Sequence, residues 1–247
     1  MNALLKSQFG ISLVLALAVP ASVEFAAASS PKEEFDQLKE SCFISHEGES
    51  GLAEECQEGP ALAEKVLKTD PDNIEVLYKY SRLLLKDLRR KEAKIVWEKI
   101  LKLDPDHVGS LEYIELYSYS MDKKKKLKLL KRIVELEPNH PRAYWSLAVT
   151  FVSLGREKDA ADAMKAHIGL IKKGVEVQRL SSVMNSFVNQ MTDKGFTREL
   201  PDVIFEYVSV SKGGPMVCFN AKDYQKRLKL KSKKLGEAVK EFCSGEE

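Results

Sequence analysis

Four cysteines carry the most reactive side chains of the chain, and their positions point to structural cross-links. Cys42 and Cys56 each lie seven residues from Glu49. If two antiparallel helices turn near Glu49, Cys42 and Cys56 face each other across the hairpin. Their Cα atoms would then lie within the ~6 Å separation that a disulfide requires. Two buried free thiols are the alternative, but the export signal described below favours oxidation. The sequence therefore predicts a disulfide between Cys42 and Cys56.

Cys218 and Cys243 pose a different problem, because they lie near the two ends of one expected basic helix. Asn220 is placed to cap this helix, and apolar residues from Tyr224 to Phe242 follow along its buried side. A straight helix of this length holds the two thiols roughly 30 Å or more apart. Either the helix breaks near Gly236, or the thiols stay unpaired or join another chain. The sequence leaves these alternatives open.

The remaining chemical groups do not form a catalytic or metal-binding pattern. The four histidines, His46, His107, His140 and His167, are scattered, and His107 and His140 recur at equivalent positions of a repeat. The sequence has no glycine-rich phosphate loop and no nucleophile elbow. The acidic residues fall on expected solvated helix faces, where no burial would shift their pKa values. We therefore expect no enzyme activity, no cofactor and no metal.

The charge of the chain is nearly balanced but unevenly distributed. Lys and Arg number 39 against 37 Asp and Glu, giving a net charge of +2, and basic residues cluster at 123–132 and 222–234. Aromatic residues that could stack on bases are not interleaved with these lysines, so nucleic acid is not an expected partner. Peripheral contact with an anionic envelope surface remains an alternative to a simple solvated face.

The first 28 residues have the pattern of a secretory signal peptide. Lys6 provides a positive start, and residues 11–19 form a short apolar core. Two small-residue cleavage sites follow, Val19-Pro20-Ala21 and Ala26-Ala27-Ala28, and the second is preferred. The apolar core is well short of the ~20 residues that span a membrane. We expect cleavage after Ala28, a periplasmic or secreted protein, and no transmembrane span in the mature chain. An uncleaved anchor is the alternative.

A repeat of about 34 residues is the strongest pattern in the sequence. The turn at Asp70-Pro71 recurs at Asp104-Pro105 and at Glu137-Pro138, so its prolines lie 34 and 33 residues apart. Proline ends the preceding helix because it lacks a backbone donor. Asp72 is expected to cap the next helix, with Glu75 completing a capping box, and Asp106 and Asn139 offer equivalent caps.

Each repeat unit has the periodicity of two antiparallel helices with alternating large and small residues. Matching positions are Leu77, Tyr80, Ser81, Leu84, Ala93, Trp97 and Ile100 in the first unit, and Tyr144, Leu147, Ala148, Phe151, Ala160 and Met164 in the third. This pattern resembles the tetratricopeptide repeat (TPR) family, in the form of an exported bacterial TPR protein. The middle unit departs from it, because Glu115 replaces a small residue and an expected turn at 123–126 is one residue short.

The resemblance implies an all-α, right-handed superhelix of antiparallel helix pairs with helical caps. We expect a signal peptide at 1–28, an N-terminal capping helix hairpin at 29–59, TPR-like repeats at 60–173 and a C-terminal helical cap at 174–247. In the last part, the apolar residues from Leu180 to Met191 form one helical stripe. Residues 199–208 are expected to return as a helix, with a strand as the alternative.

The resemblance also implies a groove, lined by the first helix of each unit, that binds a partner protein or peptide. Residues just off the packing stripes are expected to line it: Tyr78, Lys79, Arg82, Lys86, Glu112, Tyr113, Leu116, Tyr119, Arg142, Trp145, Ser146 and Val149. Tyr and Trp beside Arg are typical of binding hot spots. The expected function is a periplasmic adaptor or scaffold. The alternatives are a structural subunit packed edge to edge in an envelope complex and, less favoured, an enzyme with an unrecognised C-terminal site.

Overall fold

The protein is an all-α, TPR-like superhelix. The computed structural model describes residues 29–43, 51–118 and 120–243, and these contain twelve α-helices, three short 3₁₀ helices and no strand. The α-helices are α1 (Pro31–Asp36), α2 (Gly59–Thr69), α3 (Ile74–Lys86), α4 (Arg90–Leu103), α5 (Val108–Tyr117), α6 (Lys123–Leu136), α7 (Pro141–Ser153), α8 (Glu157–Gly169), α9 (Leu180–Asp193), α10 (Leu200–Ser211), α11 (Pro215–Arg227) and α12 (Lys233–Cys243). The 3₁₀ helices are η1 (Glu40–Cys42), η2 (Glu54–Cys56) and η3 (Ile171–Lys173).

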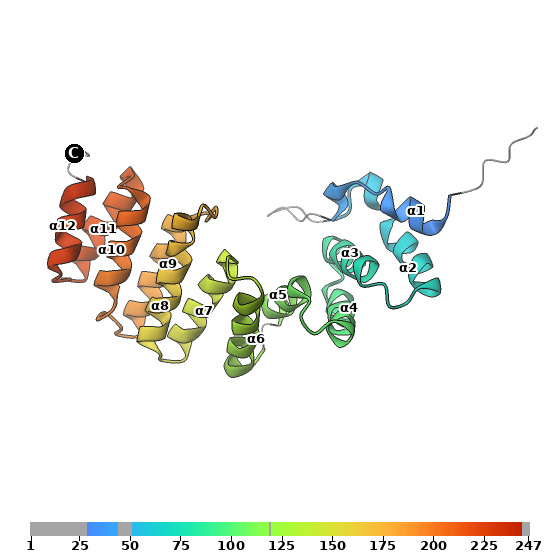
Figure 1. Cartoon of the computed structure of the whole chain (residues 1–247), viewed down its shortest axis with the longest axis horizontal. Coiled ribbons are helices and arrows are strands. Elements are labelled where there is room, and N and C mark those ends of the chain that lie inside the picture. Colours follow the sequence, from blue (N-terminus) through green and yellow to red (C-terminus); the bar gives the residue numbers. More distant parts are fainter. Residues whose placement is uncertain (1–28, 44–50, 119, 244–247) are drawn as a thin grey trace, which may run out of the picture.

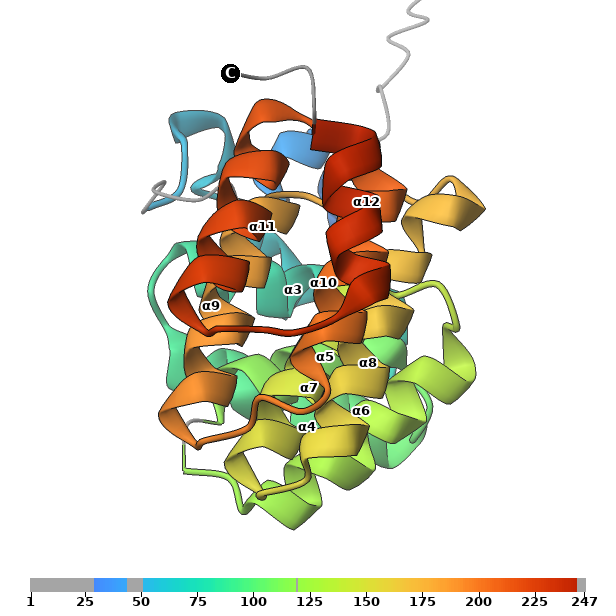
Figure 2. The same cartoon turned by 90° about the vertical axis from the view of Figure 1, so that its left-hand side faces the viewer.

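The helices stack in pairs along one long axis, with α1 and α12 at opposite ends (Figure 1). The three predicted units are α3/α4, α5/α6 and α7/α8, and the stack continues through α9/α10 and α11/α12. Towards the C-terminus α7 packs on α9 and α9 on α11, while α8 packs on α10 and α10 on α12. Viewed along the stack, α9 and α11 lie on one side and α8 and α12 on the other (Figure 2). The first helices of successive pairs thus form one continuous side of the superhelix.

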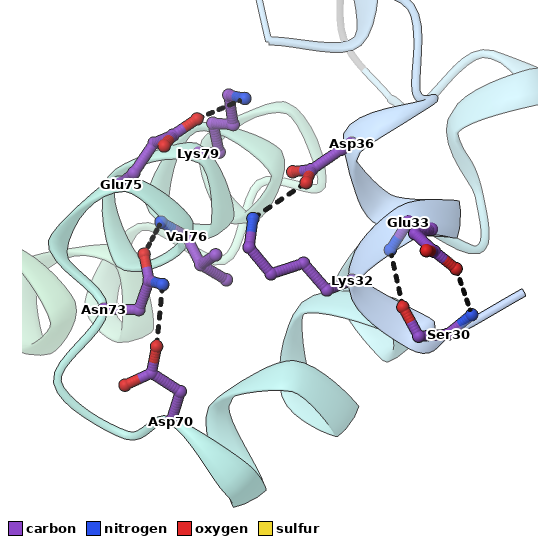
Figure 3. A network of polar contacts seen from close by, with 9 residues as sticks. All are labelled: Ser30, Lys32, Glu33, Asp36, Asp70, Asn73, Glu75, Val76 and Lys79. Atoms are coloured by element: carbon purple, nitrogen blue, oxygen red, sulfur yellow. Dashed lines mark hydrogen bonds and ion pairs between the residues drawn. The ribbon is translucent and has the colours of Figure 1, made fainter.

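The repeat helices begin one residue later than the sequence predicts, so the expected caps are wrong. Asn73, rather than Asp72, caps α3 by accepting a hydrogen bond from the Val76 amide at 3.1 Å (Figure 3). The Nδ1 atoms of His107 and His140 accept equivalent bonds at the starts of α5 and α7. In each Asp-Pro or Glu-Pro turn, the amide of the cap residue donates to the carbonyl of the acidic residue three positions earlier. This hydrogen bond closes the turn, so the helix begins one residue later than expected.

The predicted capping box is also absent from α3, where Glu75 pairs instead with Lys79 at 2.9 Å (Figure 3). A capping box is present on α1. The Glu33 amide donates to Ser30 Oγ at 3.2 Å, and the Ser30 amide donates to Glu33 Oε2 at 2.7 Å. These reciprocal bonds satisfy two of the free amides at the start of a helix of only six residues.

The N-terminal segment is less regular than the expected helix hairpin. It consists of the short α1 and the single turns η1 and η2, and α1 packs on α2. Cys42 and Cys56 are buried and disulfide-bonded, with their Cα atoms 5.5 Å apart, so the predicted pairing is present. Residues 44–50, including the expected turn at Glu49, lie outside the described residues, as do residues 1–28 with the expected signal peptide.

The C-terminal part resolves the question of Cys218 and Cys243. The expected single helix is two helices: α11 begins at Pro215, so Asn220 lies buried inside it and is not a cap. The chain reverses at residues 228–232, where Lys229 adopts a positive φ of 50°, rather than at Gly236. Because α12 returns antiparallel to α11, Cys218 and Cys243 meet and form a disulfide, with a Cα separation of 5.5 Å.

In the middle unit, Glu115 stands where the repeat pattern has a small residue, and an ion pair with Lys126 compensates its buried charge. Glu115 is 5% exposed, and its Oε1 lies 2.6 Å from the Lys126 ammonium. Lys126 belongs to the first turn of α6, which Asp122 caps, so the expected turn at 123–126 is helical. A buried carboxylate is tolerated when an opposite charge compensates its lost hydration.

Candidate functional site

The first part of the predicted groove is a cluster of aromatic rings from α3 and α5 with one arginine. The rings of Tyr78 and Tyr113 lie 6.2 Å apart, and the Arg82 guanidinium lies 5.8 Å from the Tyr78 ring. The Arg82 Nε is buried and has no hydrogen-bond partner among the described residues. Burial raises the pKa of Tyr78 to about 12, with Arg82 opposing the shift. The cluster therefore offers an arginine with unused hydrogen-bonding capacity beside neutral tyrosines.

Tyr113 also has a structural role that the sequence did not reveal. Its ring stacks on Trp97 at 4.9 Å between centroids, with an interplanar angle of 5°. Tyr117 lies on the same stack, 5.7 Å from Trp97. We expected Tyr113 to belong to no packing stripe, and this expectation is wrong. Through this stacking, the aromatic cluster packs directly on Trp97 in the core of the first repeat.

Glu112 connects the aromatic cluster to the third repeat. Its carboxylate lies 3.7 Å from His140 Nε2 and 3.6 Å from Arg142. Burial favours the protonated carboxyl, but the nearby His140 ring and the positive charges of Arg142 and Arg82 together lower the pKa of Glu112. The same contact with Glu112 raises the pKa of His140 against its burial. Glu112 is thus held ionised at the junction of α5 and α7.

The third repeat contributes half of the residues that line a hollow of about 290 Å³. Five of the predicted groove residues line it together: Leu116, Arg142, Trp145, Ser146 and Val149. Its other lining residues, Glu115, Lys126 and Gln190, are not among the predicted groove residues. The repeat pattern indicates only that Glu115 replaces a small residue and that Lys126 belongs to a turn. Gln190 belongs to α9, which lies beyond the recognised repeats. We call this the groove hollow.

A second hollow of about 320 Å³ shares Trp145 and Arg142 with the groove hollow. These two residues line both hollows, and the second is completed by Pro141, His167, Glu176, Val177, Gln178 and Val183. Trp145 packs partly against the core, so its indole is half-buried and held in place. A rigid aromatic ridge between two hollows can contact a bound chain on both of its faces.

Lys79 and Lys86 line neither hollow and contact the N-terminal segment instead. Lys86 donates to the Ser41 carbonyl at 2.6 Å, and the Lys79 ammonium lies 5.5 Å from the Phe43 ring. Both therefore hold the N-terminal segment against α3. Tyr119, the remaining predicted groove residue, lies outside the described residues.

His167 makes stability depend on pH in a predictable direction. Its Nδ1 donates to the Pro141 carbonyl of the preceding helix at 2.9 Å, and its Nε2 is buried without a hydrogen-bond partner among the described residues. Burial lowers the pKa of His167, although the hydrogen bond opposes this. The unfolded chain, with a pKa near ~6.5, therefore binds a proton more readily than the folded one.

We expect the stability that the neutral His167 contributes to be present above about pH 6.5 and lost as the pH falls through its lowered pKa. Urea unfolding of wild type and His167→Gln at pH 7.5 and pH 5 measures this, because Gln can still donate to Pro141. The wild type should lose more stability than the variant on acidification. Equal losses would show that His167 is not responsible.

Gly109 allows the close approach of Tyr78 to α5. A Cβ at this position would lie 2.5 Å from the Tyr78 hydroxyl oxygen. Gly109→Ala should therefore destabilise the protein by about 1–3 kcal/mol through overpacking. In a Tyr78→Ala background the same change should be neutral, or stabilising by up to ~1 kcal/mol through helix propensity. Urea unfolding of the four proteins tests this, and an equal cost in both backgrounds would refute the contact.

Within the described ranges, no three His, Cys, Asp or Glu side chains gather closely enough to hold a metal ion. In the same part of the chain, no helix is both long and apolar enough to cross a lipid bilayer.

The fold and the groove define the class of protein: a helical-repeat superhelix of the TPR type. Solved structures of MamA and YrrB share this fold. One MamA structure (AMB-1) has a TM-score of 0.52 at 18% identity, covering 72% of this chain and 94% of its own. YrrB, described as a TPR protein with an unusual peptide-binding site, has a TM-score of 0.51 at 16% identity, covering 67% and 83%. No protein-family model matches the chain, and no curated protein matches it. At these identities the likeness concerns the fold alone.

Proposed function

We propose that this protein is a periplasmic adaptor that binds a peptide or helix of a partner protein along the side formed by α3, α5, α7 and α9. The observation that carries this proposal is the placement of Trp145 and Arg142 between two hollows, beside the aromatic cluster with its unpartnered Arg82 Nε. The peptide-binding site named for YrrB, a protein of the same fold, is consistent with such a role.

The lining residues favour a ligand of a particular composition. Leu116, Trp145 and Val149 offer apolar contact to one bulky side chain, which would be buried in the groove hollow. Lys126 and Arg142 are already paired with Glu115 and Glu112. Arg82 forms no ion pair with a described carboxylate, although its charge acts on Glu112, and its unpartnered Nε can donate to a carboxylate of the ligand. The proposed ligand therefore combines a large apolar residue with a carboxylate several residues away.

Selection from a random peptide library on the immobilised protein tests this function. Enriched peptides should share an apolar residue and an acidic residue at a fixed spacing. Arg82→Gln should weaken their binding by about 1.5–3 kcal/mol, the value of a hydrogen bond to a charged group. Arg90→Gln is the matched control, since Arg90 also lies 5.8 Å from a tyrosine ring but belongs to α4. A lack of any shared motif, or equal effects of the two variants, would count against the groove.

We further propose export to the periplasm, on the evidence of residues 1–28. Their short apolar core is followed by Ala26-Ala27-Ala28 at a spacing suited to signal peptidase. The two disulfides are consistent with an oxidising compartment. N-terminal sequencing of the protein from its native cell envelope should give a chain that begins near Ser29. An intact Met1 would contradict cleavage.

A further inference from the structure

The outer face of α11 carries an apolar patch at the C-terminal end of the superhelix. Met216 is 60% exposed and Phe219 is 71% exposed, and both line an open hollow of about 560 Å³ with Pro215, Cys218 and Lys222. The opposite face of α11 is buried through Val217, Ala221 and Tyr224. The terminal pair of a solenoid usually presents a polar outer face to water. The exposed side of α12 conforms, since it carries Lys and Glu, but the exposed side of α11 does not.

Two lysines border this patch on the same face of α11. Lys222 and Lys226 follow Met216 and Phe219 at helical spacings of three and four, so all four residues share one face. Neither lysine forms an ion pair with another described residue, and both are exposed. Asp223, the acidic residue of α11, is paired with Arg227 at 3.3 Å. From residue 212 to 243 the chain has nine Lys and Arg against three Asp and Glu.

We propose that this face docks on the surface of an anionic phospholipid bilayer. Phe219 and Met216 insert at the boundary between headgroups and acyl chains, and the lysines contact the anionic headgroups around them. This combination of a short apolar anchor and a basic rim gives reversible peripheral binding, since each lysine near an anionic surface adds attraction and the apolar pair adds burial. Docking through the end of the superhelix leaves the groove on α3, α5, α7 and α9 free of the membrane.

Charge and composition disfavour the other occupants of the patch. Two copies meeting through this face would bring two sets of uncompensated lysines together. A nucleic acid would satisfy the lysines, but it offers no apolar environment to Met216, and Phe219 is a lone ring rather than a row of stacking residues. A bilayer with anionic headgroups satisfies both the charge and the apolar side chains.

The test measures contact at the patch itself, so that binding through residues 1–28 cannot imitate it. Phe219→Trp in the full chain places an indole at the proposed depth, and unsubstituted chain gives the background from Trp97 and Trp145. Vesicles of phosphatidylcholine with about one third phosphatidylglycerol, brominated on the acyl chains, should quench the fluorescence of the introduced indole. Unsubstituted chain should show no such quenching, and salt should weaken the effect because it screens the lysines.

Variants then separate the two contributions to binding. Lys222→Gln with Lys226→Gln should lower the partition onto anionic vesicles about 25-fold, at about fivefold per lysine. Met216→Ser with Phe219→Ser should lower it at least about tenfold, whereas Ile95→Ser, at an exposed apolar residue of α4, should not change it. Absent quenching, equal binding to neutral vesicles, stronger binding to single-stranded DNA, or a dimer that Phe219→Ser abolishes would each overturn the proposal.

Discussion

Replacing Trp97 with alanine is expected to lower the free energy of unfolding by about 3–5 kcal/mol, the range for removing a large buried aromatic residue. Trp97 is fully buried, and its indole stacks on Tyr113 and Tyr117. Its Nε1–H also donates to Ser81 Oγ at 2.7 Å. The substitution removes the packing that joins α4 to α5 and leaves a cavity between the first two repeats. Urea unfolding followed by circular dichroism measures the loss.

Two controls isolate the role of Trp97. Ile95→Ala changes an apolar residue of the same helix that is 65% exposed, and it should alter stability by less than about 0.5 kcal/mol. Trp97→Phe retains a ring for stacking but loses the bond to Ser81, so its cost should fall between the other two. If Trp97→Ala unfolds with wild-type stability, the stacking of the first two repeats does not depend on this residue.

The three repeats were predictable because their signal is local and periodic. Pro71, Pro105 and Pro138 fix the phase, and large and small residues between them can pack in only one way around each helix pair. Trp97 was therefore assigned to the core, and it is fully buried. The same phase placed Arg142, Trp145, Ser146 and Val149 on one side, and all four line the groove hollow.

What the sequence could not reveal depends on contacts between segments far apart in the chain. Lys86 was assigned to the groove from its helical phase alone, but it is held by Ser41, 45 residues earlier. Gln190 lines the groove hollow because α9 continues the stack without matching the repeat pattern. The pairing of Cys218 with Cys243 required a helix break at 228–232, where Lys229 is not a residue type that predicts a positive φ.

Replacing Trp145 with alanine is expected to weaken peptide binding by roughly 2 kcal/mol or more. Trp145 lines both hollows, so its removal merges them and takes away the apolar surface that each would present to a ligand. Because the indole also packs partly on the core, we expect a modest fall in melting temperature with the helical circular dichroism spectrum retained. Calorimetric titration with a peptide selected on the wild-type protein measures the affinity.

Tyr144→Ala provides the matched control for this variant. Tyr144 is the adjacent aromatic residue of α7 and also packs partly on the core, but it lines neither hollow. Tyr144→Ala should cost comparable stability and leave peptide affinity nearly unchanged. Equal losses of affinity in the two variants would mean that binding responds to the general stability of α7 and not to the Trp145 ridge.

Site-specific photo-crosslinking in the native cells tests most directly whether the groove side is where a partner protein binds. A photoreactive phenylalanine analogue at Ser146 lies in the groove hollow, and the same analogue at Ile95 lies on the exposed face of α4. The groove account predicts a discrete adduct with one partner protein from position 146 that Arg82→Gln diminishes, and no such adduct from position 95. An adduct from position 95 alone would contradict it and place the interaction on the other face of the superhelix.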